Sequence, residues 1–245
     1  MIHWGINALN HGSSIAVVKD NQLVDYSFFP RDRISLEEFQ SALSHGSPER
    51  IFWYERPWLK KLRQARAGQW SRVFDIDDIP KLYLIKHSLG NVPVTYTPHH
   101  ASHAAAGYYT SPFDNAAVVV LDAIGEFDCA SIWHGRGDNL TKVWSARYPN
   151  SLGLFYSAFT DLIGYRPVAE EHLLQKLSAG GDPEKYYYDV KDYMSGIVHA
   201  QKNMHKRIVD WPYEITEVDK AHIAAAVQEV FEEQVERVMR KAKSL

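Results

Sequence analysis

The sequence predicts an α/β protein with a mixed β-sheet flanked by helices. Three short runs rich in apolar and β-branched residues lie before residue 30, and turn-forming residues separate them, which is typical of an antiparallel meander. Helix and strand signals then alternate through the middle of the chain. A later apolar run at residues 116–121 has strand length and predicts a strand covered on both faces.

The individual elements follow in order. Ser35 can cap a helix that reaches Leu43, because Glu38 stands three residues later as in a capping box. The meander strands are expected at residues 4–9, 14–18 and 22–29. Later strands are expected at residues 51–54, 92–96 and 116–121, a second meander through 131–133 and 140–146, and helices at 57–67, at the histidine-rich residues 99–103 and at 220–245.

Three antiparallel strands followed by alternating helices and strands are the opening pattern of an actin-like or ribonuclease-H-like lobe. Such folds place their sites where strand ends meet helix starts. No stretch matches a Walker loop or a dinucleotide-binding fingerprint. The pattern therefore predicts the fold without naming a ligand.

Composition narrows the class of protein. The chain has 245 residues, enough for one large domain or two small ones, and a formal net charge of −3, which argues against a dedicated duplex nucleic-acid binder. Cys129 is the one cysteine, so no internal disulfide can form, as is usual in a reducing cytosol. We see no leader and no apolar run of membrane-spanning length, and we expect a cytoplasmic enzyme without a membrane partner.

Two histidines and an aspartate form a candidate metal site. His99 and His103 stand four residues apart, which places their imidazoles on one face of a helix, and Asp122 ends the next apolar strand. Two nitrogens and one carboxylate suit iron, zinc, manganese or magnesium and leave positions for a substrate. The alternative is that the two histidines are surface or core residues without a ligand role.

The turn after the first strand is a second candidate site. It contains Gly12, Ser13 and Ser14, small residues whose backbone N–H groups could hold an anionic group. The alternative is an ordinary tight hairpin turn.

Five short stretches occur in the order in which one known family carries them. They are residues 10–14 (NHGSS), 51–57 (IFWYERP), 99–104 (HHASHA), 120–126 (VLDAIGE) and 151–160 (SLGLFYSAFT). Together they resemble the O-carbamoyltransferases of antibiotic and nodulation-factor biosynthesis, which are related to the tRNA threonylcarbamoyl-transferase subunit. The resemblance implies an actin-like (ASKHA) fold and runs from about Gly5 to the C-terminus.

The resemblance also implies a reaction. A carbamoyl group would pass from carbamoyl-adenylate to an acceptor hydroxyl, after a separate C-terminal domain has made that intermediate from carbamoyl phosphate and ATP. The family's metal ligands map onto His99, His103 and Asp122, with iron as the favoured ion and a fourth carboxylate expected from a second lobe. The histidine of the family's His-Asp-x-Ser turn maps onto His11, a candidate base for the acceptor hydroxyl.

Some positions depart from the family pattern. The aspartate of the His-Asp-x-Ser turn is Gly12 here, and the acidic run after the first meander is replaced by residues 29–33 (FPRDR). Within residues 170–181 a family lysine is replaced by Leu173, which leaves Lys176 or His172 as substitutes. The residues that we expect to bind substrate are Ser13, Ser14, Gly125, Glu126 and Lys176.

Residues 1–245 are expected to form the N-terminal lobe of a carbamoyltransferase, with an α/β core at 1–181 and a mostly helical extension at 182–245. That extension would lead into a second lobe, and we expect this lobe and the C-terminal domain in cis or as a separate chain. Two other functions stay open: a relative that modifies tRNA, with a nucleoside acceptor, and a non-catalytic lobe that binds a metal or a partner.

Overall fold

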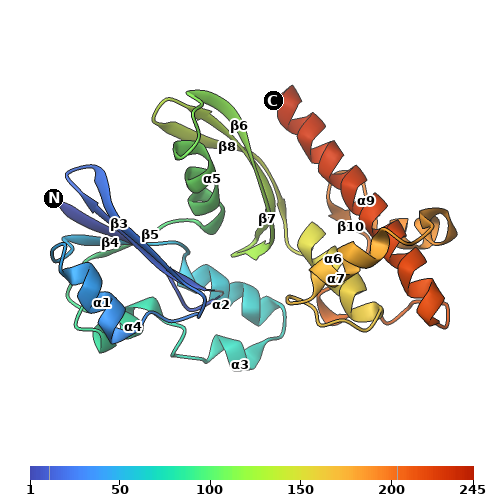
Figure 1. Cartoon of the computed structure of the whole chain (residues 1–245), viewed down its shortest axis with the longest axis horizontal. Coiled ribbons are helices and arrows are strands. Elements are labelled where there is room, and N and C mark those ends of the chain that lie inside the picture. The colour runs from blue at the N-terminus through green and yellow to red at the C-terminus, as the bar shows by residue number, and fades with distance from the viewer. Residues whose placement is uncertain (11, 203) are drawn as a thin grey trace. The chain divides into compact units, whose positions relative to one another are not determined.

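The structure is a computed structural model that describes residues 1–10, 12–202 and 204–245 (Figure 1). The chain forms two compact units, Met1–Ser102 and His103–Leu245. The strands after residue 115 form a sheet of their own in the second unit. Among the described residues we find no helix with the length and apolar character needed to span a bilayer.

The first unit is built on a five-stranded mixed sheet. Its strands are β1 (Ile2–Asn7), β2 (Ser13–Lys19), β3 (Gln22–Phe29), β4 (Arg50–Trp53) and β5 (Val94–Tyr96), in the order β3-β2-β1-β4-β5. The first three are antiparallel neighbours, whereas β4 runs parallel to β1 and β5 parallel to β4. This is the strand order of a ribonuclease-H-like sheet, so the predicted α/β, actin-like fold is confirmed.

Alternation of side chains creates the core of the first unit. Trp4 and Ile6 of β1 point to the same face as Ile15 of β2 and Trp53 of β4, and all four are buried. Helices α1 (Leu36–Leu43) and α4 (Pro80–Lys86) pack on this face (Figure 1). The predicted capping box of Ser35 and Glu38 is present. Helices α2 (Pro57–Arg66) and α3 (Trp70–Val73) complete the unit, and the chain leaves it within α5 (His99–Tyr109).

The second unit begins with a three-stranded antiparallel meander. Its strands are β6 (Asn115–Gly125), β7 (Asp128–Arg136) and β8 (Asn139–Arg147), in that order across the sheet. The prediction that residues 116–121 are covered on both faces is wrong, because only Val120 of this run is buried. β6 lies at the edge of a three-stranded sheet, so it has a neighbouring strand on one side only and is less covered than the central strand β7.

Helices supply most of the second core. They are α6 (Leu152–Leu162), α7 (Glu171–Ser178), α8 (Tyr187–Lys191) and α9 (Glu217–Ser244), with short 3-10 turns at Pro183–Lys185 and Met204–Lys206 and a two-stranded ribbon of β9 (Met194–Ser195) and β10 (His199–Ala200). Phe155 and Phe159 of α6 pack with Leu174 of α7 and Val227 of α9. Residues 182–245 therefore share one core with α6 and β7. The helix predicted at 220–245 is confirmed.

Candidate metal centre

His99 and His103 lie one turn apart on α5, and Asp122 lies on β6. Each offers one ligand atom, and the three atoms all lie within 4.8 Å of one another. A divalent ion such as zinc binds nitrogen and oxygen ligands at about 2.0–2.2 Å, so its ligand atoms must lie within a few ångströms of one another. Among the described residues, two imidazoles and a carboxylate at this spacing fit a divalent ion of the zinc or iron type.

Asp122 occupies an irregular part of its strand. The pairing of β6 with β7 is regular up to Leu121 opposite Ala130 and resumes with Gly125 opposite Asp128, so the register breaks across the intervening residues. The Ala123 N–H donates to Oδ1 of Asp122 over 2.7 Å. Because bulges change the direction in which side chains point, the break frees Asp122 from strict strand alternation.

The start of α6 supports this strand end from within the second unit. The Ser151 hydroxyl caps α6 by accepting from the Leu154 N–H at 3.0 Å, and it donates to the carbonyl oxygen of Ala123 at 2.6 Å. Two residues later, Gly153 lies directly against the Ala123 backbone. Residues 151–153 thus hold the chain immediately after Asp122.

A buried ion pair lies beside His99 in the first unit. Lys60 Nζ lies 2.9 Å from Oε1 of Glu55, and Nδ1 of His99 lies 3.5 Å from Oε2 of the same carboxylate. Burial by itself would raise the pKa of Glu55, but the neighbouring His99 and Lys60 outweigh it and hold that pKa below its usual value. The sequence analysis did not assign Glu55 or Lys60 to the site. A usable signal was the stretch YERP, which contains Glu55 and leads into a helix with a lysine in its first turn.

The first predicted substrate-binding turn is only partly described. His11 lies outside the described residues. Gly12 has a φ of +54°, and a Cβ there would lie 3.0 Å from the Phe28 ring, so this turn suits glycine and not the family's aspartate. Ser13 is fully buried, and its hydroxyl has no hydrogen-bond partner among the described residues, whereas Ser14 is half-buried and faces the other side of the sheet.

The other predicted substrate-binding residues lie in the second unit. Gly125 and Glu126 are buried where β6 turns into β7, on the same strand end as Asp122. Glu126 has a φ of +60°, a backbone conformation that costs a non-glycine residue free energy and that clusters at functional sites. Lys176 is exposed on α7, a helix that packs on α6 and α9.

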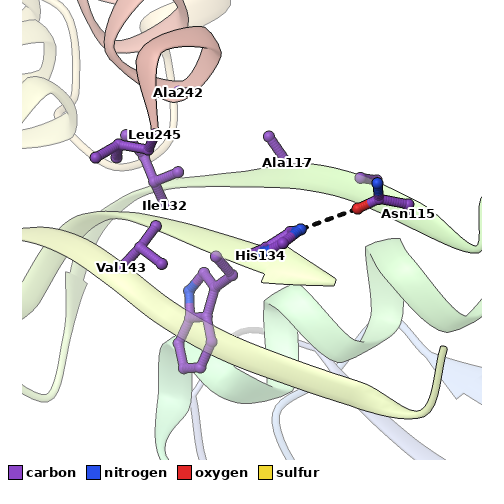
Figure 2. Close-up of a pocket in the computed structure, with 9 residues that line it drawn as sticks. Asn115, Ala117, Ile132, His134, Val143, Ala242 and Leu245 are labelled. Carbon is purple, nitrogen blue, oxygen red and sulfur yellow. Dashed lines mark hydrogen bonds between the residues drawn. The ribbon is translucent and has the colours of Figure 1, made fainter. Parts of the chain in front are cut away.

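A separate pocket lies on the meander of the second unit (Figure 2). His134 and Asn115 form its polar part, with 2.9 Å between Nε2 and Oδ1. The remaining lining is mostly apolar: Ala116, Ala117, Ile132, Trp133, Val143, Ala242 and Leu245. None of the predicted site residues lines it, so the metal-ligand cluster is the better candidate for chemistry.

Comparison with known proteins points to one family. A family model described as "Carbamoyltransferase N-terminus" matches residues 49–244. Protein sll1178 of Synechocystis is 33% identical over 214 residues, which cover 74% of this chain and 35% of that protein. Nodulation protein NolO of Bradyrhizobium diazoefficiens is 28% identical over 110 residues, 42% of this chain and 20% of NolO. The chain thus spans about a third or less of these relatives.

Solved structures resemble the chain more distantly. The Aquifex aeolicus PPX-GPPA enzyme is 16% identical, with a TM-score of 0.39, and the match covers 96% of this chain and 92% of that one. A TM-score this low carries no fold assignment, and the actin-like fold follows instead from the strand order β3-β2-β1-β4-β5 of the first unit.

Proposed function

This chain belongs to the carbamoyltransferase N-terminus family, and from that premise we propose that it forms the metal-binding part of an enzyme that carbamoylates an acceptor hydroxyl. One observation carries the proposal. The residues that resemblance to O-carbamoyltransferases assigns to the metal, His99, His103 and Asp122, have their ligand atoms within 4.8 Å of one another. Two imidazoles and a carboxylate, brought together from a helix and a strand end, form a donor set that suits a divalent ion.

The proposed donor is carbamoyl-adenylate, made from carbamoyl phosphate and ATP. When bound, iron or another divalent ion would supply Lewis acidity toward a carbonyl or phosphate oxygen. Gly125 and Glu126 would contact the donor, since they lie on the same strand end as Asp122. His11 would take the proton of the acceptor hydroxyl, for which an imidazole has a suitable pKa near neutral pH.

The reaction is proposed for a longer protein. The chain spans 35% of sll1178 and 20% of NolO, so the remaining length of such proteins has room for a second lobe and a domain that makes carbamoyl-adenylate. We propose that the fourth metal ligand and the contacts to ATP come from there.

The test is a transfer assay with the full-length protein. Purified protein is given carbamoyl phosphate, ATP and a panel of hydroxyl acceptors that includes nucleosides, and carbamoylated products are measured by mass spectrometry. We expect product from the wild type and from His134→Ala, whose imidazole lies in the separate pocket, and none from His103→Ala.

The other outcomes separate the alternatives. A product on a nucleoside alone would favour tRNA modification. A protein that binds metal but consumes no carbamoyl phosphate, whichever acceptor is added, would favour a non-catalytic lobe. If protein stripped of metal formed as much carbamoylated product as the untreated wild type, the proposal would be contradicted.

A further inference from the structure

We propose that Glu55 positions His99 for metal binding and that Lys60 holds Glu55 in place. The inference rests on the metal site of the proposed function and assigns it a supporting layer in the first unit. Neither Glu55 nor Lys60 belongs to the ligand group itself.

The two oxygens of the Glu55 carboxylate have different neighbours. Oε1 lies 2.9 Å from Nζ of Lys60, a normal length for a charged hydrogen bond. Oε2 lies 3.5 Å from Nδ1 of His99. All three residues are more than nine-tenths buried, with exposed fractions of 5%, 8% and 7% for Glu55, Lys60 and His99.

Because these side chains are buried, the charge of Glu55 needs a partner. A buried carboxylate is costly unless it is paired, and Lys60 provides the compensating charge. With one oxygen engaged by Lys60, the other faces Nδ1 of His99 at 3.5 Å and can accept its N–H once the two atoms close to hydrogen-bonding distance. A proton on Nδ1 leaves the lone pair on Nε2, so the carboxylate selects the tautomer that binds a metal through Nε2.

Two contacts tie the helix that carries His99 to the segment that carries Glu55. Glu55 lies between the end of β4 and Pro57, the first residue of α2, and Lys60 lies in the first turn of that helix. The Ser102 hydroxyl of α5 donates to the carbonyl oxygen of Tyr54 at 2.9 Å. The Tyr54 ring meets the His99 ring edge-on, with centroids 5.4 Å apart. The first turn of α5 is therefore tied to the segment that carries Glu55.

The experiment must separate positioning from a purely structural ion pair. Replacing Glu55 alone would leave a buried lysine unpaired, so both partners are changed together. Glu55→Leu/Lys60→Met removes the acceptor and both charges, and such replacements are often neutral for stability. Glu55→Gln/Lys60→Met keeps an acceptor for Nδ1–H without either charge. Glu233→Leu/Lys191→Met is the control: this less buried pair, 2.6 Å apart, lies in the second unit, away from His99 in the sequence.

Metal affinity is the first measurement, made on full-length protein with Zn²⁺ against a competing chelator. Loss of a hydrogen-bond partner of a metal-binding histidine typically weakens affinity about 10- to 100-fold. We expect that loss for Glu55→Leu/Lys60→Met, a partial recovery for Glu55→Gln/Lys60→Met, and no change for the control.

The His99 tautomer is the second measurement, read from ¹⁵N chemical shifts of the metal-free protein. We expect the proton on Nδ1 in the wild type and a mixture of tautomers in the leucine variant. A leucine variant whose dissociation constant stays within about threefold of the wild type would overturn the positioning role alone. A wild type that binds no Zn²⁺ or Fe²⁺ would overturn both this role and the proposed function.

Discussion

Gly153 lies against the backbone of Ala123, the residue that follows Asp122 in β6. A Cβ built on Gly153 would come within 2.6 Å of the Ala123 Cα, closer than side-chain and backbone atoms approach each other. The Ser151 hydroxyl holds the same residue through its carbonyl oxygen. The first turn of α6 thus restrains the strand end that presents the carboxylate ligand.

Gly153→Ala should therefore disturb both stability and metal binding. Because the clash is with backbone, the strand or the helix must shift, at a cost of about 1–3 kcal/mol in the free energy of unfolding. Chemical denaturation and Zn²⁺ titration measure the two effects.

Gly107→Ala is the matched control, since a Cβ on this helical glycine would lie 3.9 Å from Val118, an ordinary contact. Alanine should stabilise that helix by up to about 1 kcal/mol. Unchanged stability and metal affinity in Gly153→Ala would contradict the restraint.

His103→Ala should remove most of the bound metal. In residues 1–245 the two remaining protein ligands would hold a divalent ion weakly against water, so the metal content of this chain purified without chelator should fall well below one ion per chain. His45→Ala changes an exposed histidine of the first unit outside the ligand group and should leave the content unchanged. Equal metal in wild type and His103→Ala would refute the assignment.

We expect the free energy of unfolding to fall at alkaline pH because Tyr83 loses its proton. Its hydroxyl donates to the Ile34 carbonyl oxygen at 2.9 Å and accepts from the Ile34 N–H at 2.8 Å, and burial raises the pKa of Tyr83 to about 12. An unfolded tyrosine has a pKa of about 10, so the stabilisation is complete below pH 10 and is lost as the pH rises from 10 to 12.

The comparison with Tyr83→Phe isolates this effect. At pH 8 the variant should be less stable by about 1–3 kcal/mol, because the buried Ile34 groups lose their partner. That difference should shrink by about 1.4 kcal/mol for each pH unit above 10, since the variant has no proton to lose at this position. A difference that is the same at pH 8 and pH 11 would contradict the prediction.

Residues 1–245 alone should bind metal and give no carbamoyl transfer. The matched family model describes an N-terminus, and the chain covers only 35% of sll1178, so we expect the proposed fourth metal ligand and ATP contacts to come from outside residues 1–245. Assays of the isolated chain beside the full-length protein test this. Product formed by residues 1–245 alone would show that the chain carries a complete site.

Local patterns in the sequence were sufficient for much of this protein. The short apolar run at residues 4–9, followed by turn-forming residues, predicted a strand, and the spacing of Ser35 and Glu38 predicted a capped helix, because each depends on contacts within a few residues. The spacing of His99 and His103 likewise placed both imidazoles on one helix face. The equivalent cap of α9, Thr216 with Asp219, was readable in the same way and was missed, so that helix was predicted to begin three residues late.

Tertiary structure alone decided the rest. The division after Ser102 and the exposure of β6 depend on which strands pair, and pairing partners cannot be read from one apolar run. Glu55 meets His99 across 44 positions of sequence, and Ser151 reaches Ala123 across 28. No local periodicity encodes such contacts, because they arise only when packed elements bring distant segments together.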